Sequence, residues 1–299
     1  MNQSLLICIC TYRREELLAQ CLQSLRSAGN VCRVLVVDNA DSGACREICR
    51  QYEVDYVAEK DLGLSKARNR GLQECQEDWI LYLDDDATVR KQTIEYLKKR
   101  VNTAVVSIAA IGGRYEHYYR KTPPAWIKQM AGVGNSPDDG MSDYGPLPAD
   151  SYLSGGIFCV RLSALLAVDG FRSRMGMQGS KMAYGEEDDV QDRLRTAGYT
   201  IAYAPEVVID HLYHERKFSL ATQLRMRYAY GIANRRRGTT RSWLAGLCAC
   251  LFYRFPYHLG RWLIKHRDWA WQRVLLELFG PLAYWWGTVP PVFKGDDRG

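Results

Sequence analysis

The sequence predicts an α/β fold in which helices flank a mostly parallel sheet. Apolar runs and amphipathic segments alternate four times over about the first hundred residues, as in a parallel sheet with crossover helices. The first run, residues 4–10, is apolar without interruption, which indicates a strand buried on both faces. Polar residues follow three of the runs, at Thr11, Asp38 and Asp84. Ligands bind such sheets beyond the carboxyl ends of the strands, so these residues mark the expected site.

Each element of this first part follows from a local pattern. The strands are short apolar runs, and the helices carry apolar residues at intervals of three and four, such as Leu18, Leu22 and Leu25. Glycines such as Gly29 mark helix ends. We therefore expect strands at residues 4–10, 33–37, 54–58 and 79–83, and helices at residues 15–25, 43–51, 65–75 and 93–101.

The rest of the chain is less regular. Residues 104–113 predict another strand, and residues 121–148 predict a long loop of the kind that is often functional. Gly155 and Gly156 interrupt an apolar run, where backbone can approach a ligand closely. A helix beginning at Glu186 is followed by short strands at residues 200–204 and 207–209, which lead to His211. From residue 220 the chain is predicted to be mostly helical.

Charge and tryptophan are unevenly distributed along the 299 residues. From His211 onward there are 15 Lys and Arg against 5 Asp and Glu, whereas the remainder has 25 against 29. The same C-terminal part holds six of the eight tryptophans. A basic, Trp-rich segment suits a membrane surface better than nucleic acid. We expect an interfacial helix with Trp262, Trp269 and Leu276 on a common face, or alternatively a helical cap with the tryptophans in its core.

The ten cysteines show neither a CxxC pair nor zinc-ligand spacing. They are interpreted as reduced thiols used as small core residues, which indicates a cytosolic protein. No N-terminal signal sequence and no uninterrupted apolar stretch of about 18 residues is recognised. The expected location is therefore cytoplasmic, peripheral at the inner face of the cell membrane.

Three consecutive aspartates, Asp84, Asp85 and Asp86, follow the apolar run 79–83. Carboxylates this close repel one another, and burying them without a counter-charge costs several kcal/mol or more. A divalent cation resolves this, because hard cations prefer carboxylate oxygens and share their other positions with water and phosphates. The pattern predicts a metal site for a phosphate-bearing donor. The alternative is an ordinary turn after a strand.

A second acidic run, Glu186 to Asp189, opens a helix about a hundred residues later. The helix dipole favours one or two carboxylates there, but it does not account for four. A transfer reaction needs a base to take the proton of the incoming hydroxyl, and a carboxylate beside the metal suits that role. The alternative is a solvated, charge-capped helix.

In order along the chain, these motifs resemble those of family 2 glycosyltransferases of the GT-A fold. The matching segments are CTYRRE at 10–15, VVDN at 36–39, GLSKARNRG at 63–71, LDDD at 83–86, GG at 155–156, GF at 170–171, GEEDD at 185–189 through Arg193, and PE at 205–206 through His211. The resemblance covers roughly residues 4–214. Each motif alone is weak, but their order and spacing are specific.

The resemblance implies a role for each matching residue. Thr11 and Asp38 would contact the nucleotide, and Gly63 and Arg68 would support its pocket. Asp84 and Asp86 would form the Asp-x-Asp motif, with Asp86 as a ligand of Mn²⁺ or Mg²⁺ and Asp84 at the ribose or the metal. Asp85 belongs to the same donor-binding cluster, either as a donor contact or only as the spacer between them. Gly155 and Gly156 would approach the donor, and His211 would be a third metal ligand or, alternatively, a structural histidine.

The position of the base is set by register within the second acidic run. The family shows Gly-Glu-Asp with an arginine seven residues after the glutamate, and counting back from Arg193 gives Glu186. Glu187 then takes the position of the base, Asp188 is its rival, and Glu186 would hold the acceptor hydroxyl. Asn39 stands where many members have a second aspartate, which leaves thymidine or guanosine donors possible beside uridine.

The implied enzyme is a metal-dependent, inverting transferase. It would move a sugar from a nucleotide-diphospho-sugar, expected to be a UDP-sugar, to a glycan or lipid-linked acceptor in polysaccharide or lipopolysaccharide synthesis. Residues 1–218 would form the GT-A catalytic domain and residues 219–299 a helical, membrane-associating region. Two alternatives are a nucleotidyltransferase, although no Gly-rich phosphate loop follows the first strand, and a non-catalytic membrane scaffold that keeps the fold.

Overall fold

A computed structural model describes residues 2–29, 32–130, 141–179, 181–239, 243–265 and 270–290. The chain forms two compact units. The first comprises Met1–Tyr118, Val133–Gly179 and Glu186–Leu212, and the second comprises Tyr119–Gly132, Ser180–Gly185 and Tyr213–Gly299. The functional division at residue 218 that the sequence suggests stays a prediction.

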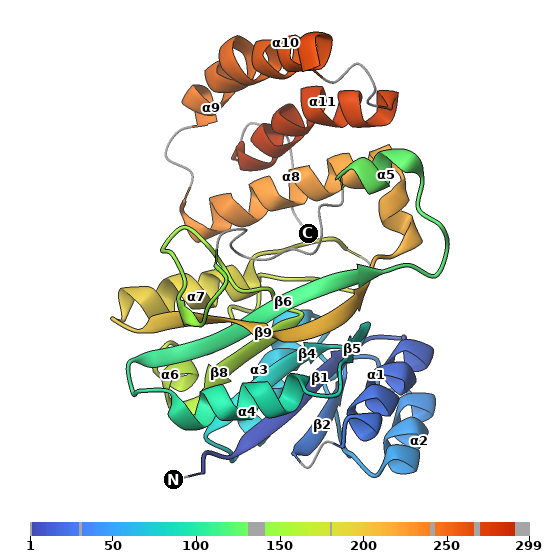
Figure 1. The fold of residues 1–299 in the computed structure, drawn as a ribbon, viewed down its shortest axis with the longest axis vertical. Helices are drawn as coiled ribbons and strands as arrows, with labels where there is room; N and C mark the ends of the chain where they lie inside the picture. Colours follow the sequence, from blue (N-terminus) through green and yellow to red (C-terminus); the bar gives the residue numbers. More distant parts are fainter. Residues whose placement is uncertain are drawn as a thin grey trace. The chain divides into compact units, whose positions relative to one another are not determined.

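The first unit is built on a nine-stranded mixed sheet (Figure 1). Its first half is parallel throughout, with β1 (Leu5–Thr11) between β2 (Arg33–Asp38) and β4 (Trp79–Asp84), and β3 (Asp55–Ala58) beyond β2. The second half continues from β4 through β8 (Ile157–Arg161), β6 (Ile108–Tyr118), β9 (Thr200–Leu212) and β5 (Ala87–Val89), with β7 (Gly145–Pro146) also paired to β9. In this half only β6 and β9 run parallel, and the other pairings are antiparallel.

Helices cover both faces of this sheet, because alternate residues of each central strand are apolar on opposite sides. Ile7, Val36 and Leu81 face one core, which is completed by α1 (Glu15–Ser27), α2 (Gly43–Tyr52) and α4 (Thr93–Thr103). Leu6, Leu35 and Ile80 face the other core, which is completed by α3 (Leu64–Glu74), α6 (Leu162–Ala167) and α7 (Glu186–Thr196). The expected α/β architecture is confirmed.

Every strand and helix expected in the first hundred residues is present, with ends within two residues of the prediction. Three expectations beyond them are wrong. The strand expected at 104–113 begins only at Ile108 and runs to Tyr118, and the segment 121–148 contains α5 (Ala125–Met130) and β7 rather than loop alone. Residues 131–140 of that segment lie outside the described residues. The strands expected at 200–204 and 207–209 are the single strand β9.

The continuity of β9 through Pro205 has a local cause. The pairing of β6 with β9 shifts register between Gly112 and Arg114, where it passes from Tyr203 directly to Val208. A Cβ atom on Gly113 would lie 1.8 Å from the carbonyl oxygen of Val207. The missing side chain therefore lets the irregular part of β9 pass close to β6 without ending the strand.

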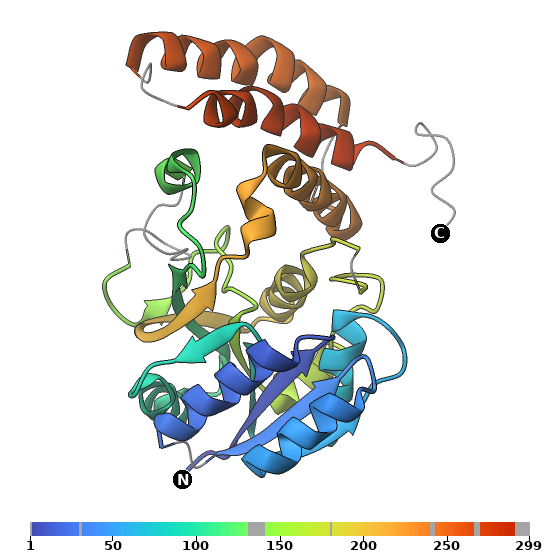
Figure 2. The same ribbon diagram turned by 90° about the vertical axis from the view of Figure 1, so that its right-hand side faces the viewer.

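The second unit is helical (Figure 2). Its helices are α5, α8 (Leu220–Arg237), α9 (Trp243–Ala249), α10 (Phe255–Lys265) and α11 (Trp271–Thr288), with a π-helical turn η2 (Cys250–Arg254) between α9 and α10 and a short 3₁₀ helix η1 (Glu215–Phe218) before α8. A Cβ on Gly231 would lie 2.0 Å from the carbonyl oxygen of Tyr284, so a glycine is required where α8 and α11 meet. None of the helices in the described residues has the length and apolarity needed to cross a membrane.

Candidate active site

The carboxyl ends of the central strands bring the first predicted residues together. Thr11 is the register partner of Asp38, and Asp84 is the partner of Cys10 on the other side of β1. His211 is distant from the aspartates in the sequence. The pairing of β9 with β5 places it opposite Ala87 and so brings it next to them. The amide of Leu212 also donates to the carbonyl of Asp86 at 3.0 Å. The sheet therefore fixes His211 beside the aspartates.

Asp84, Asp86 and His211 form one cluster of potential ligands. The His211 Nε2 atom lies 3.4 Å from Asp84 Oδ2 and 3.2 Å from Asp86 Oδ1. One ligand atom from each of the three side chains fits within 4.8 Å of the others. The Nδ1 atom of His211 lies 3.2 Å from the carbonyl oxygen of Leu212, and a proton held there leaves Nε2 for a cation. Two carboxylates and one imidazole are a donor set that fits Mn²⁺ or Mg²⁺.

Asp85 lies between Asp84 and Asp86 and makes hydrogen bonds of its own, so it is more than a spacer. Its buried carboxylate accepts hydrogen bonds from Thr11 Oγ1 at 2.7 Å and from Arg14 Nη1 at 2.8 Å. Burial raises the pKa of Asp85 to about 7, against the opposing effect of the Arg14 guanidinium. The hydroxyl of Thr11 is directed at Asp85, so a donor contact by Thr11 or Asp85 stays a prediction.

Arg14 is a site residue to which the sequence assigned no role. Its guanidinium lies 2.8 Å from Asp85 and 3.1 Å from Asp86, and its side chain is 31% exposed. It supplies one fixed positive charge to a group of three carboxylates, which leaves the cluster acidic. The only signal for it was its place in the motif, three residues after Thr11 and directly before the first helix.

Arg68 links the two acidic clusters. Its guanidinium is 3% exposed and lies 3.1 Å from Glu186 Oε1, 3.6 Å from Glu187 Oε2 and 3.7 Å from Asp84 Oδ1. Burial alone would lower the pKa of Arg68, but the three carboxylates outweigh it and raise that pKa above its ordinary value. The residue expected to support the nucleotide pocket thus binds carboxylates on both sides, and its role toward a donor stays a prediction.

Glu186 and Glu187 differ in access although they are adjacent on α7. The Glu186 side chain is 4% exposed, whereas that of Glu187 is 22% exposed. Burial, together with the like charge of Glu187, raises the pKa of Glu186 well above its ordinary value, against the opposing effect of Arg68. Glu187 is therefore the more accessible carboxylate, and the contact of Glu186 with the acceptor hydroxyl stays a prediction.

The other two acidic residues of this run have different surroundings. Asp189 is paired with Arg172 at 2.8 Å and with Arg193 at 2.9 Å, which anchors the start of α7. Asp188 follows Glu187 by one residue, which turns it about 100° around the helix. Since Glu187 faces Arg68, Asp188 points to a different side.

Gly155 and Gly156 lie between the two clusters. A Cβ on Gly155 would lie 2.5 Å from Glu187 Oε1, and one on Gly156 would lie 3.1 Å from His211 Cδ2 and 3.4 Å from Asp84 Oδ2. Gln191 fixes this loop, because its buried amide accepts from the Leu153 amide at 2.8 Å and donates to the Leu153 carbonyl at 3.1 Å. The two glycines are therefore required for the clusters to lie so close.

Asp38 and Asn39 shape the neighbouring corner. The Asp38 carboxylate accepts from the amides of Ala40 at 2.9 Å and Ser42 at 2.6 Å, and is 1% exposed. The Asn39 amide donates to the carbonyls of Glu59 and Asp61 and accepts from the amide of Gly63 at 2.7 Å. An aspartate could not donate to two carbonyls, so the departure from the family's second aspartate has a structural reason. A nucleotide contact by Asp38 or Gly63 stays a prediction.

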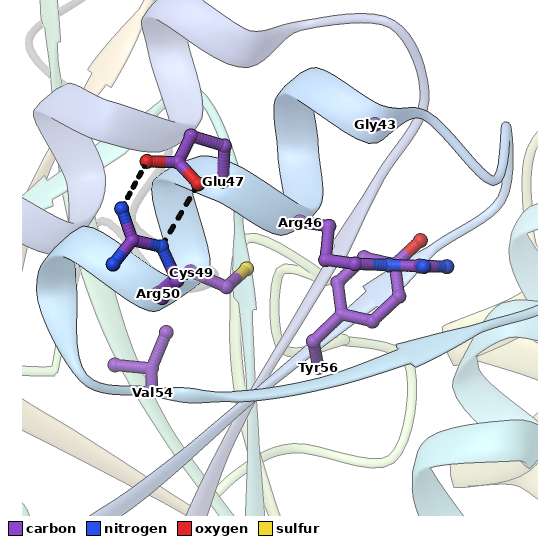
Figure 3. A pocket seen from close by; sticks show the side chains of 7 residues that line it. All are labelled: Gly43, Arg46, Glu47, Cys49, Arg50, Val54 and Tyr56. Carbon is purple, nitrogen blue, oxygen red and sulfur yellow. Dashed lines mark hydrogen bonds and ion pairs between the residues drawn. The ribbon is translucent and has the colours of Figure 1, made fainter.

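A surface depression next to this corner holds none of the predicted site residues (Figure 3). It lies between α2 and β3, where the Arg46 guanidinium stacks over the Tyr56 ring and Glu47 pairs with Arg50. Tyr56 connects it to the site, because its hydroxyl donates to Asp38 at 3.2 Å.

Comparison with known proteins agrees with this geometry. The family model described as Glycosyl transferase family 2 matches residues 6–162, slightly more than half of the chain. The succinoglycan biosynthesis protein ExoM of Rhizobium meliloti (strain 1021) is 29% identical over 256 residues, 79% of this chain and 77% of that protein. The rhamnosyltransferase WbbL of Escherichia coli (strain K12) is 25% identical over 252 residues, 77% of this chain and 93% of that protein.

Two solved structures share the fold at low sequence identity. The mannosyltransferase PcManGT from Pyrobaculum calidifontis, in complex with GDP-Man and Mn²⁺, has a TM-score of 0.63 at 14% identity and covers 99% of this chain and 89% of its own. GalNAc-T7 with UDP, GalNAc and Mn²⁺ has a TM-score of 0.55 at 13% identity and covers 78% of this chain and 51% of its own. The fold is that of GT-A glycosyltransferases, and the chain belongs to glycosyl transferase family 2.

Proposed function

We propose that this glycosyltransferase moves a sugar from a nucleotide-diphospho-sugar to a hydroxyl of a glycan or lipid-linked acceptor, with a divalent metal and with inversion. The observation that carries the proposal is the meeting of two acidic clusters at one edge of the sheet. Asp84, Asp86 and His211 offer a cation site, and Glu187 offers a partly exposed carboxylate. The backbone of Gly155 and Gly156 and the side chain of Arg68 lie between them.

In this proposal Asp84, Asp86 and His211 hold Mn²⁺ or Mg²⁺. When bound, the ion would neutralise the charge that develops on the leaving diphosphate. The imidazole in the donor set favours Mn²⁺, because Mg²⁺ is more demanding of oxygen ligands in octahedral geometry. Arg14 keeps Asp85 and Asp86 in place beside this site through its two ion pairs.

Glu187 is the proposed base. Its carboxylate takes the proton of the acceptor hydroxyl as the hydroxyl oxygen bonds to the anomeric carbon, and the bond from that carbon to the diphosphate oxygen breaks on the opposite side. The leaving nucleoside diphosphate keeps the electron pair. Arg68 supports this role because its guanidinium lies 3.6 Å from Glu187 Oε2 and holds that carboxylate in place. The direction of its side chain toward Arg68 favours Glu187 over Asp188, and the burial of Glu186 favours a supporting part for it.

The donor would lie along the carboxyl ends of β1, β2 and β4. Thr11, Asp38 and Gly63 would border the nucleoside, and Asp84 and Asp85 the diphosphate side. Gly155 and Gly156 would let the sugar approach the backbone. Arg68 would support the pocket through its buried ion pairs with the surrounding carboxylates. We propose a UDP-sugar as the first candidate, with dTDP- and GDP-sugars as alternatives because Asn39 occupies the position of the second aspartate.

The acceptor is proposed to be a growing glycan or a lipid-linked glycan in polysaccharide or lipopolysaccharide synthesis. The naming of one relative as a succinoglycan biosynthesis protein and of another as a rhamnosyltransferase supports this assignment. The basic, Trp-rich C-terminal part supports a location at the cytoplasmic face of the cell membrane. Membership of the glycosyltransferase family sets aside the nucleotidyltransferase alternative.

Isothermal titration of the purified chain separates the enzyme from a non-catalytic scaffold. UDP, dTDP and GDP are titrated with Mn²⁺ present and then with EDTA. We expect one of them to bind in a metal-dependent manner, with the matching nucleotide-sugar raising the melting temperature. A scaffold would bind none of them in a metal-dependent manner, and that result would contradict the proposal.

A further inference from the structure

Exposed apolar side chains are concentrated in the helical unit. Of the fourteen large apolar side chains that are exposed among the described residues, ten belong to this unit. Six of the ten fall within residues 251–264, which form η2 and α10. Such a concentration marks an interaction surface, whereas single exposed apolar residues would not.

Helix α10 is apolar on two opposite sides. Phe255, Leu259 and Trp262 pack against Val274 and Leu278 of α11, and the two helices run alongside each other (Figures 1 and 2). Outside this contact, Phe252 and Tyr253 of η2 and Tyr257 and Ile264 of α10 are 81%, 70%, 52% and 79% exposed. We call these four residues the exposed aromatic face.

Three members of this face lie together because of their spacing. Tyr253, Tyr257 and Ile264 are separated by four and seven residues, which places them on one side of a helix. The rings of Tyr253 and Tyr257 are stacked with centroids 6.2 Å apart. A helix that is apolar on both sides requires a second apolar environment besides the core it already packs on.

The charges around the face indicate what that environment is. Arg254 and Arg261 are exposed on the same stretch, and residues 216–265 contain eleven Lys and Arg but no Asp or Glu. The nearby acid of α11, Glu277, lies 3.3 Å from the Nδ1 atom of His258. Aromatic and aliphatic side chains bordered by arginines fit the interface of a bilayer that carries anionic lipid. A protein partner of mixed charge would be matched less well.

We propose that the exposed aromatic face docks this glycosyltransferase on the surface of a bilayer containing anionic lipid, with Phe252, Tyr253, Tyr257 and Ile264 in the headgroup region. The inference rests on the proposed function only in that a membrane-borne acceptor makes docking useful. It also corrects the surface expected from the sequence. Trp262 lies on α10 and Leu276 on α11, where both pack into the interior of the unit, and Trp269 lies outside the described residues.

The test is co-sedimentation of the full chain with two kinds of vesicle, phosphatidylcholine alone and phosphatidylcholine with phosphatidylglycerol. The face variant is Phe252→Ser/Tyr257→Ser/Ile264→Ser. Its matched control is Val105→Ser/Val106→Ser/Leu166→Ser, which removes three exposed apolar side chains of the other unit. A charge variant, Arg254→Gln/Arg261→Gln, is compared with Arg46→Gln/Arg50→Gln on the exposed side of α2.

We expect the wild type and both controls to bind the anionic vesicles. The face variant should bind at least about tenfold more weakly. The charge variant should lose about fivefold for each arginine, and this loss should disappear in high salt. Equal loss in the face variant and its control, or no binding by the wild type, would overturn the proposal.

Light scattering tests the alternative that a second copy of the chain, rather than a bilayer, binds the exposed aromatic face. A wild-type dimer that the face variant converts to a monomer would also overturn the proposal. Mn²⁺ and nucleotide binding are measured on the same preparations. If the face variant loses vesicle binding but keeps nucleotide binding, the result bears on this inference alone. If the wild type does not bind nucleotide, the result bears on the proposed function alone.

Discussion

In the first acidic cluster, Asp84 to Asp86, the partly exposed Arg14 pairs with Asp85 and Asp86, and Asp84 is 34% exposed and lies 3.7 Å from Arg68. In the second, Glu186 and Glu187 share the fully buried Arg68, and Asp189 has two arginines of its own. The first cluster is thus open and short of positive charge, whereas the second has its cations built in. An open cluster can accept a metal from solution, and a closed one can hold a carboxylate in a fixed place and charge state.

The two clusters also differ in how they are connected. Arg68 reaches Asp84 of the first cluster from its position within the second. The metal site and the proposed base therefore share one buried counter-charge. The predictions below separate the two clusters or remove the connection between them.

The largest effect is expected from Glu187→Gln. If Glu187 is the base, transfer should fall by about 10²- to 10⁴-fold because no carboxylate takes the acceptor proton. Nucleotide and Mn²⁺ binding should persist, because the amide has nearly the same shape. Steady-state kinetics and titration measure the two quantities, with Asp188→Asn as the matched variant. An active Glu187→Gln beside an inactive Asp188→Asn would move the base to Asp188.

Replacing Arg68 by Met should remove the ion pairs that connect the two acidic clusters. It leaves Glu186, Glu187 and Asp84 without their shared cation, and breaking a buried ion pair in this way costs about 3–5 kcal/mol of folding stability. The loss should be larger at pH 8 than at pH 5, since the raised pKa of Glu186 favours its neutral form at the lower pH, where it needs no cation. Urea unfolding measures it.

Two variants accompany this measurement. Arg46→Met, at an arginine that is 65% exposed, should change stability by less than about 0.5 kcal/mol. Arg68→Lys keeps the charge and should fold if Arg68→Met does not. Wild-type stability of Arg68→Met at both pH values would contradict the assigned role.

Gly155→Ala should displace the carboxylate of Glu187, the proposed base, while leaving that carboxylate chemically unchanged. The new Cβ would lie 2.5 Å from Glu187 Oε1, so the carboxylate must move. A displacement of about 1 Å can cost up to about 100-fold in rate. Kinetics of Gly155→Ala are compared with Gly43→Ala, whose Cβ would meet no atom within 4 Å. Equal rates in both variants would show that Glu187 need not lie against this loop.

Glu186→Gln should alter the pH dependence of stability. The pKa of Glu186 is raised in the folded protein, so the folded state holds this proton more tightly than the unfolded chain. Its contribution to stability is therefore greatest at low pH and is lost as pH rises from the ordinary glutamate range through the raised value, by about 1.4 kcal/mol per pH unit.

The glutamine variant lacks this slope and should gain on the wild type as pH rises. Urea unfolding over a pH series measures the difference. Glu47→Gln is the control, because Glu47 is exposed and its pKa is lowered to about 2 by Arg50. Parallel curves for the wild type and Glu186→Gln would contradict the assignment.

The sequence was sufficient for the parallel half of the fold because each of its strands is a short apolar run with a polar end. It was insufficient where long-range pairing decides the structure. The antiparallel pairing of β5 with β9, which delivers His211 to Asp86, has no local signal. The continuity of β9 through Pro205 depends on Gly113 of another strand.

The candidate site shows the same division. The acidic residues could be predicted as chemistry, since clustered carboxylates demand a cation wherever they lie. Their partners could not, because the buried bonds of Arg68, Arg14 and Gln191 join residues far apart in the sequence. Asp85, which the spacing suggested as a spacer, has its own buried partners for the same reason.

The most direct test of the central claim is a Mn²⁺ titration followed by electron paramagnetic resonance, with and without UDP, dTDP or GDP. We predict that the wild type binds Mn²⁺, that one nucleotide tightens this binding, and that Asp86→Asn weakens it by at least about tenfold. Asp41→Asn, an exposed carboxylate near the end of β2, should behave as the wild type. Equal Mn²⁺ binding by Asp86→Asn and the wild type, or binding that no nucleotide changes, would contradict a metal-dependent donor site at the three aspartates.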